Sequence, residues 1–357
     1  MPLPLSTEPA PPAPALAARY RRLSRRRLGW LAALLLALLA SVVVDVSLGP
    51  SQLPLADVAR ALWSPASADT AQRVIVWEVR LPFAVLAVLV GASLGLAGAE
   101  MQTVLNNPLA SPMTLGLAAA AAVGAALAVI LGLSWVVAGE NLAVPLAAFA
   151  GAALSTLLIQ ALAWRHGASV ETVVLFGIAL LFAFEALLWL MQYMADANAL
   201  QQIVFWNMGS LTRATWAKIG IVASVLAACA LWSARDAGAL TAMRGGEEQA
   251  RSLGLAVGRL RLLTLLRVSL VAATALAFVG TIGFVGLVGP HIARLLLGEN
   301  QRHMLPGAAL AGALMLSLAS ILSKSLVPGV VLPIGIITAL VGVPMFMALV
   351  WRSRKGL

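Results

Sequence analysis

Long, uninterrupted apolar runs constrain this chain more than any other feature. Two examples are Leu31–Val44 and Gly307–Ile321. A helix needs roughly 20 mostly apolar residues to span a bilayer, and the mean hydropathy over the whole chain is +0.95. A soluble domain carries about 25% charged residues, whereas this chain carries 11%. Disorder requires low hydrophobicity, and outer-membrane barrel strands alternate polar and apolar residues. The sequence therefore predicts an all-α, polytopic membrane protein.

Ten membrane-spanning segments are predicted. They cover approximately residues 28–44, 82–104, 113–133, 142–163, 172–193, 215–233, 262–283, 290–298, 305–325 and 332–351. The eighth is too short to cross a bilayer alone, and it follows four glycines spaced by three (Gly280, Gly283, Gly286 and Gly289) and then Pro290. This pattern indicates a broken or re-entrant segment, which is tolerated only where protein buries it.

The first 27 residues are rich in proline and then in arginine, which predicts a disordered, basic cytoplasmic tail before a single membrane domain over 28–357. A basic cluster before an apolar run can be a signal peptide, but no clear cleavage site follows here, so we interpret 28–44 as an uncleaved span. In this topology 18 of the 24 Lys and Arg residues, Arg267 among them, lie on the side of the termini. The positive-inside rule then places both termini in the cytoplasm, and it accounts for the net charge of +10 without a nucleic-acid partner.

No motif for catalysis or metal binding occurs in the sequence. It contains no phosphate-binding P-loop, no His-Glu-x-x-His zinc motif and no nucleophile elbow. The three histidines (His166, His291 and His303) are far apart in sequence. The single cysteine, Cys229, allows neither an intrachain disulfide nor a cysteine-based metal site. We expect no enzyme activity, no catalytic or metal-binding residue and no bound cofactor in this chain.

The longest polar stretch of the second half covers about 234–260. Glu247 and Arg251 form an i,i+4 acid-to-base pair that favours a short helix, and Gly254 can end it. Such a helix is either a solvated connector or a docking element for a cytoplasmic partner.

Three acidic residues fall inside predicted spans: Asp45, Glu100 and Glu185. Ionisable groups at membrane depth are costly and usually face protein or water. Asp45 is expected near the membrane interface. Glu100 and Glu185 are either protonated packing residues or polar groups that line a pathway. Gly91, Gly95 and Gly98 indicate close helix packing instead.

Seven segments, in order, resemble one family between about residues 30 and 352. They are Arg80–Pro82, Gly91–Gln102, Asn107–Pro112, Phe205–Leu211, Gly246–Leu255, Gly283–His291 and Leu332–Gly335. Together they resemble the permease subunits of ATP-driven importers for iron-siderophores, haem and vitamin B12, the FecCD/BtuC-like type II importers.

The resemblance implies a homodimer, or a pair of close paralogues, in the bacterial inner membrane, with the pathway at the subunit interface. It also implies two cytoplasmic ATPase subunits that carry ATP and Mg²⁺, and a periplasmic substrate-binding protein.

Residue roles follow from the resemblance by position in this sequence. The ATPase-coupling residues would be Glu247, Glu248, Ala250, Arg251, Leu253 and Gly254. The cytoplasmic gate would include Asn107, Leu109, Ser169, Val170 and Glu171. Glu185 and Glu100 would belong to the pathway, and Arg80 and Lys324 would dock the binding protein. Phe83 departs from the family, which often has a second arginine there.

The expected function is import of a metal chelate, with ferric siderophore as the first choice and haem or cobalamin as alternatives. Two hypotheses from other classes are an ion-gradient-driven secondary transporter, supported by Glu100 and Glu185, and a membrane scaffold that transports nothing.

Overall fold

The computed structural model describes residues 13–49, 51, 53–66, 68–133, 142–165 and 169–354, and their regular structure is helical. In chain order the helices are α1 (Ala13–Ser47), α2 (Leu55–Trp63), α3 (Thr70–Val74), the π-helical turn η1 (Ile75–Arg80), α4 (Leu81–Val104), α5 (Leu117–Ile130), α6 (Ala143–Arg165), α7 (Val170–Met194), α8 (Ala197–Asn207), α9 (Trp216–Met243), α10 (Glu247–Ser252), α11 (Val257–Val279), α12 (Val285–Leu297), α13 (Gln301–Ser325) and α14 (Ile334–Arg354).

The predicted spans correspond to ten of these helices. Among the described residues, 7 helical stretches are long and apolar enough to cross a membrane, and the shorter apolar helices 117–130, 285–297 and 334–348 bring the total to the ten predicted. The second stretch runs from Thr70 to Val104 because α3, η1 and α4 are continuous, so it begins well before the predicted residue 82. Pro82, which has no backbone N–H, lies in the first turn of α4 directly after the π-helical turn.

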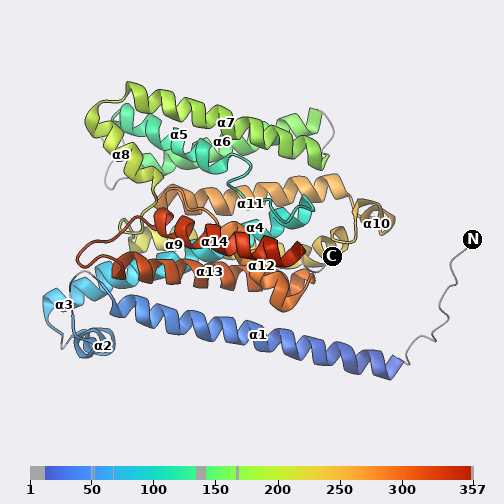
Figure 1. The fold of residues 1–357 in the computed structure, drawn as a ribbon, viewed down its shortest axis with the longest axis horizontal. Coiled ribbons are helices and arrows are strands. Elements are labelled where there is room, and N and C mark those ends of the chain that lie inside the picture. The colour runs from blue at the N-terminus through green and yellow to red at the C-terminus, as the bar shows by residue number, and fades with distance from the viewer. Residues whose placement is uncertain are drawn as a thin grey trace, which may run out of the picture.

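The helices are arranged in layers that run along one common direction (Figure 1). In that view α5, α6 and α7 form one side, α1 lies along the opposite side, and α4, α9 and α11–α14 fill the space between them. The short helices α2, α3 and α8 lie at one end of the bundle, whereas α10, the C-terminus and the start of α1 lie at the other. The two ends can therefore be assigned to the two membrane surfaces.

Helix α4 is the centre of the bundle, and glycine lets it approach its neighbours at backbone distance. A side chain at Gly91 or Gly95 would collide with the α13 backbone at Gly312 or Ala308, and one at Gly98 would collide with the α12 backbone at Gly286. This contact confirms the interpretation of the glycine pattern as helix packing.

The predicted broken segment is also confirmed. Helix α11 ends at Val279, the chain turns through Gly280 with φ of +82°, and α12 begins only at Val285. Two other non-helical segments meet it there. Ser210 N donates to Val279 O at 2.7 Å, and Ile334 N donates to Gly209 O at 3.1 Å. Two of the family-like segments, Phe205–Leu211 and Leu332–Gly335, thus bond each other's backbone, and the first also bonds the end of α11. Such bonds satisfy the polar backbone groups of non-helical chain.

Some boundaries differ from the predictions. Helix α1 begins at Ala13, so residues 13–27 are helical and not a disordered tail; residues 1–12 lie outside the described residues. The arginines are good helix formers and extend the first span toward its N-terminus. Helix α9 continues to Met243 and α11 starts at Val257, so the polar connector is shorter than 234–260.

Candidate functional site

The predicted docking helix exists as α10 at one end of the bundle (Figure 1). The predicted pair is formed, with Arg251 Nη2 3.1 Å from Glu247 Oε2. Gly254, with φ of +81°, follows the helix, and Leu255 N donates to Ala250 O at 3.1 Å while Gly254 N donates to Arg251 O at 2.9 Å. These two bonds form a Schellman motif. The glycine therefore ends the helix as its sequence position predicted.

Helix α10 presents an exposed apolar side chain beside a buried anchor. Ala250 is fully buried, whereas Leu253, one turn further on, is 64% exposed, and Glu248 is also exposed. The anchor fixes α10 to the bundle. The leucine remains free to contact another protein.

Arg261 of α11 connects α10 to the end of α4, a role that the sequence analysis did not detect. Its guanidinium bonds the carboxylate of Glu247, and its Nε donates to Val104 O at 3.1 Å. The Arg261 side chain is only 4% exposed. Val104 is the last residue of α4, so the docking helix is bonded to the helix that leads into the predicted gate.

The gate loop after α4 has a second connection through Arg244, which lies between α9 and α10. Arg244 Nη1 donates to Asn106 Oδ1 at 3.1 Å, and its Nε and Nη2 bind Glu299 at 2.6 and 2.8 Å. Asn107 accepts a bond from Leu109 N at 2.9 Å, and Leu109 is 50% exposed. The two predicted gate residues thus form one tight turn that is held by the connector.

The other predicted gate segment is the start of α7. Ser169 caps the helix and accepts a bond from Thr172 N at 3.2 Å, Val170 is half-buried, and Glu171 is exposed. The printed bonds of Arg261 join α10 to the end of α4.

Glu100 does not face a pathway, contrary to the prediction. It is fully buried and forms a bidentate pair with Arg267, with N–O distances of 3.0 and 2.5 Å. Arg267 also binds Asp236 at 2.7 Å, and its guanidinium lies 5.2 Å from the Trp232 ring. Arg267 is therefore a buried residue of α11 and not a loop charge. It neutralises Glu100 where α4, α9 and α11 meet.

A second buried pair lies toward the opposite end of the bundle. Asp45, expected near the interface, is fully buried, and its carboxylate lies 2.6 Å from Lys324 Nζ. Ser320 Oγ donates to the same carboxylate at 2.8 Å. Lys324 Nζ also lies 4.6 Å from the Phe83 ring, so Phe83 covers this pair at the position where the family often has arginine.

Arg80 is likewise internal. It is 3% exposed and donates to the backbone carbonyls of Val46 and Ser47 at 3.2 and 2.8 Å. Both residues assigned to docking of a binding protein, Arg80 and Lys324, are thus enclosed and already have partners. In this structure both side chains fix the end of α1. Their docking role, which was assigned from the resemblance, stays a prediction.

Glu185 differs from the other carboxylates at membrane depth. It lies near the middle of α7, is half-buried, and makes no hydrogen bond or ion pair with any described residue. Its neighbours on the outer face of α7, Phe182 and Trp189, are 63% and 62% exposed.

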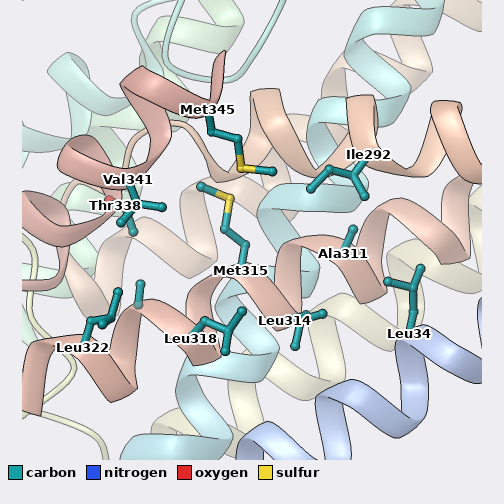
Figure 2. Close-up of a pocket in the computed structure, with 11 residues that line it drawn as sticks. Leu34, Ile292, Ala311, Leu314, Met315, Leu318, Leu322, Thr338, Val341 and Met345 are labelled. Carbon is teal, nitrogen blue, oxygen red and sulfur yellow. The ribbon is translucent and has the colours of Figure 1, made fainter. Parts of the chain in front are cut away.

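A cavity of about 150 Å³ lies between α1, α12, α13 and α14. Figure 2 shows Met315 and Met345 reaching toward each other across it, with Leu34 and Ile292 at one end. Of its lining residues only Thr338 has a polar side chain, so it offers nothing to ligate a chelate. Within the described residues no group of three or more His, Cys, Asp or Glu could hold a metal ion; His166 lies outside those residues.

Comparison with known proteins agrees with this architecture. The family model of the FecCD transport family matches residues 35–352. The vitamin B12 import system permease protein BtuC of Serratia proteamaculans (strain 568) is 38% identical over 82% of this chain and 87% of its own length. The hemin transport system permease protein HmuU of Yersinia pestis is 33% identical over 90% of this chain and 96% of its own. A solved inward-facing structure of a metal-chelate type ABC transporter matches with a TM-score of 0.79 and 29% identity, over 90% of this chain and 98% of that one.

The helical bundle, with its broken segment and the short helix α10, matches a multi-pass membrane permease of the ABC importer class, whose ATPase is a separate subunit. The chain belongs to the FecCD transport family.

Proposed function

We propose that this chain is the pore-forming subunit of an importer that carries a metal chelate across the bacterial inner membrane. Two copies, or this chain and a close paralogue, enclose the pathway. Two cytoplasmic ATPase subunits bind ATP and Mg²⁺, and a periplasmic binding protein delivers the cargo. The end of the bundle that carries α10 and the C-terminus lies in the cytoplasm, in agreement with the positive-inside rule.

The observation that carries this proposal is the position of Arg261. It is bonded to Glu247 of α10 and to the carbonyl of Val104 at the end of α4. A movement of α10 that follows ATP binding on the partner would therefore act on the gate loop that follows α4. Alternating access requires such a link between the site of ATP hydrolysis and the gates.

Leu253→Asp tests the docking surface. The exposed leucine should enter an apolar contact with the ATPase, and an unpaired charge there is expensive to bury. We expect loss of ATPase binding and of uptake, with normal membrane insertion and an unchanged melting temperature. Leu253→Ala is the matched control and should retain part of the binding. Full ATPase capture by the aspartate variant in a pull-down would contradict the proposed docking role.

Ferric siderophore is the first choice of cargo, with haem and cobalamin as alternatives. Related permeases named for vitamin B12 and for hemin support a bulky chelate of this kind. Visible absorption of the cognate binding protein would distinguish the three, because haem and cobalamin have strong, distinctive bands. A haem or cobalamin spectrum would exclude the siderophore.

The hypothesis of an ion-driven transporter loses one of its two carboxylates, because Glu100 is neutralised by Arg267 inside the subunit. If uptake into proteoliposomes requires ATP and is not changed by an imposed ion gradient, the hypothesis of an ion-driven transporter is excluded.

A further inference from the structure

The outer face of α7 is uncovered along most of its length. Val173, Gly177 and Leu188 face the rest of the subunit and are buried, whereas Phe182 and Trp189 on the other side are exposed. Glu185 follows Phe182 by three residues and precedes Trp189 by four, so it lies on one side of the same exposed face.

A carboxylate in this position is incompatible with a lipid-facing surface. Three other carboxylates of the described spans, Asp45, Glu100 and Asp236, each have a basic partner within 2.7 Å, whereas Glu78, near the start of the Thr70–Val104 stretch, is exposed. Glu185 has no such partner among the described residues and remains half-exposed near the middle of its helix. An ionisable side chain without a partner at this depth faces water or another protein chain.

We propose that Glu185 is the charged, specificity-determining group of the translocation pathway, and that the pathway favours neutral or cationic chelates over polyanionic ones. This inference rests on the proposed function, in which two copies enclose the pathway and therefore place two such carboxylates along it. Charge that lines a narrow passage raises the local concentration of oppositely charged solutes and lowers that of like-charged ones.

The proposal changes the order of the candidate cargoes. A ferric tris-catecholate is a polyanion, and haem carries two propionate carboxylates, so both are disfavoured beside Glu185. A ferric trihydroxamate or a corrinoid carries little or no net negative charge and presents amide groups that can donate hydrogen bonds to a carboxylate.

The electrostatic potential along α7 can be measured directly. In a background with Cys229→Ala, a cysteine is introduced by Phe182→Cys, one turn from Glu185 on the same face. The complete importer in proteoliposomes is treated with a cationic trimethylammonium-ethyl and an anionic sulfonatoethyl methanethiosulfonate. The rate of modification by the cation, divided by that by the anion, is compared between the importer that retains Glu185 and the Glu185→Gln variant. We expect the cation preference to fall by roughly fivefold when the carboxylate is removed.

Leu175→Cys provides the matched control. It lies on the same exposed face but ten residues from Glu185, or about 15 Å at 1.5 Å per residue, beyond the Debye length at physiological salt. Its rate ratio should change little on Glu185→Gln.

The two possible failures are distinguishable. If neither cysteine reacts in the resting, ATP-bound and binding-protein-docked states, α7 faces no water and the proposal for Glu185 is refuted, while the proposed function is decided separately by the pull-down with Leu253→Asp. If the cysteine at position 182 reacts but its rate ratio is the same with glutamate and glutamine, the pathway stands and the role of Glu185 in charge selection is refuted.

Discussion

Helices α4 and α7 are both long, apolar and interrupted by one glutamate, yet the structure uses them in opposite ways. In the most apolar part of the Thr70–Val104 stretch, which includes α4, 72% of residues are buried, against 17% in α7. Glu100 of α4 is enclosed with Arg267, whereas Glu185 of α7 is half-buried and has no partner among the described residues. A glutamate within a long apolar segment is therefore part of a structural ion pair in α4 and a candidate functional group in α7. The difference comes from the helices that pack around each of them.

The largest effect should come from Arg267→Leu. It leaves Glu100 buried without its partner, and breaking a buried pair costs about 3–5 kcal/mol. We expect little folded protein in detergent and a strongly lowered melting temperature. The double variant Arg267→Leu, Glu100→Leu should recover part of the loss, because the fully buried carboxylate is then gone and the remaining one, Asp236, is 27% exposed and can be hydrated. A wild-type melting curve for the single variant would refute the structural role of this pair.

Lys324→Met should have the second largest effect on stability. The side chain keeps a similar length and apolar stem but no longer neutralises the buried carboxylate of Asp45, so we expect a loss of about 3 kcal/mol. Association with the binding protein, normalised to the folded fraction, should stay unchanged. Slower association at unchanged stability would instead support the earlier docking prediction for Lys324.

The contrast between α4 and α7 also shows which structural features can be predicted from the sequence. Continuous hydrophobicity located all ten spans, and the spacing of Glu247, Arg251 and Gly254 predicted α10 with its termination. These are local patterns. Glu100 and Arg267 are 167 positions apart, and no local pattern connects them. Arg80 and Lys324 were assigned by resemblance to positions in a family, but the direction of a side chain depends on the neighbouring helices.

The helices α2, α3 and α8 were missed for a related reason. They are 9, 5 and 11 residues long. Helices α2 and α8 lie between membrane-spanning helices, and α3 extends the helix that contains α4, so an average of hydropathy over a long window does not detect them. The junction at Arg261 was missed because the backbone carbonyl of Val104 that it binds has no sequence signature.

Arg261→Gln should have a moderate effect on stability and a larger one on coupling. Glutamine loses the charge-assisted bond to Glu247, which is worth about 1.5–3 kcal/mol between charged groups, while Glu247 itself is 37% exposed and can be solvated. We expect normal ATPase binding but weaker cargo-stimulated uptake per ATP hydrolysed in proteoliposomes. Arg259→Gln, on the exposed side of the same helix, is the control. Equal coupling in both variants would contradict the role assigned to Arg261.

Glu185→Gln should have the smallest effect on stability. The amide keeps the shape of the carboxylate, and no partner among the described residues is lost. A melting temperature within about 1 °C of wild type is expected, which corresponds to a few tenths of a kcal/mol. A large drop would mean that Glu185 is a packing group like Glu100, and the contrast between α4 and α7 would then disappear.

The pairing of Glu100 with Arg267 also has a consequence for how the protein is made. Synthesis proceeds from the N-terminus, so α4 leaves the ribosome 167 positions before its partner arginine. Until α11 arrives, the carboxylate on α4 must remain protonated, be hydrated or be held by the insertion machinery, since a bare charge in the bilayer is costly. Completion of this pair is therefore a late step of membrane assembly. A truncation that ends before α11 should leave α4 poorly inserted and exposed to quality-control proteolysis.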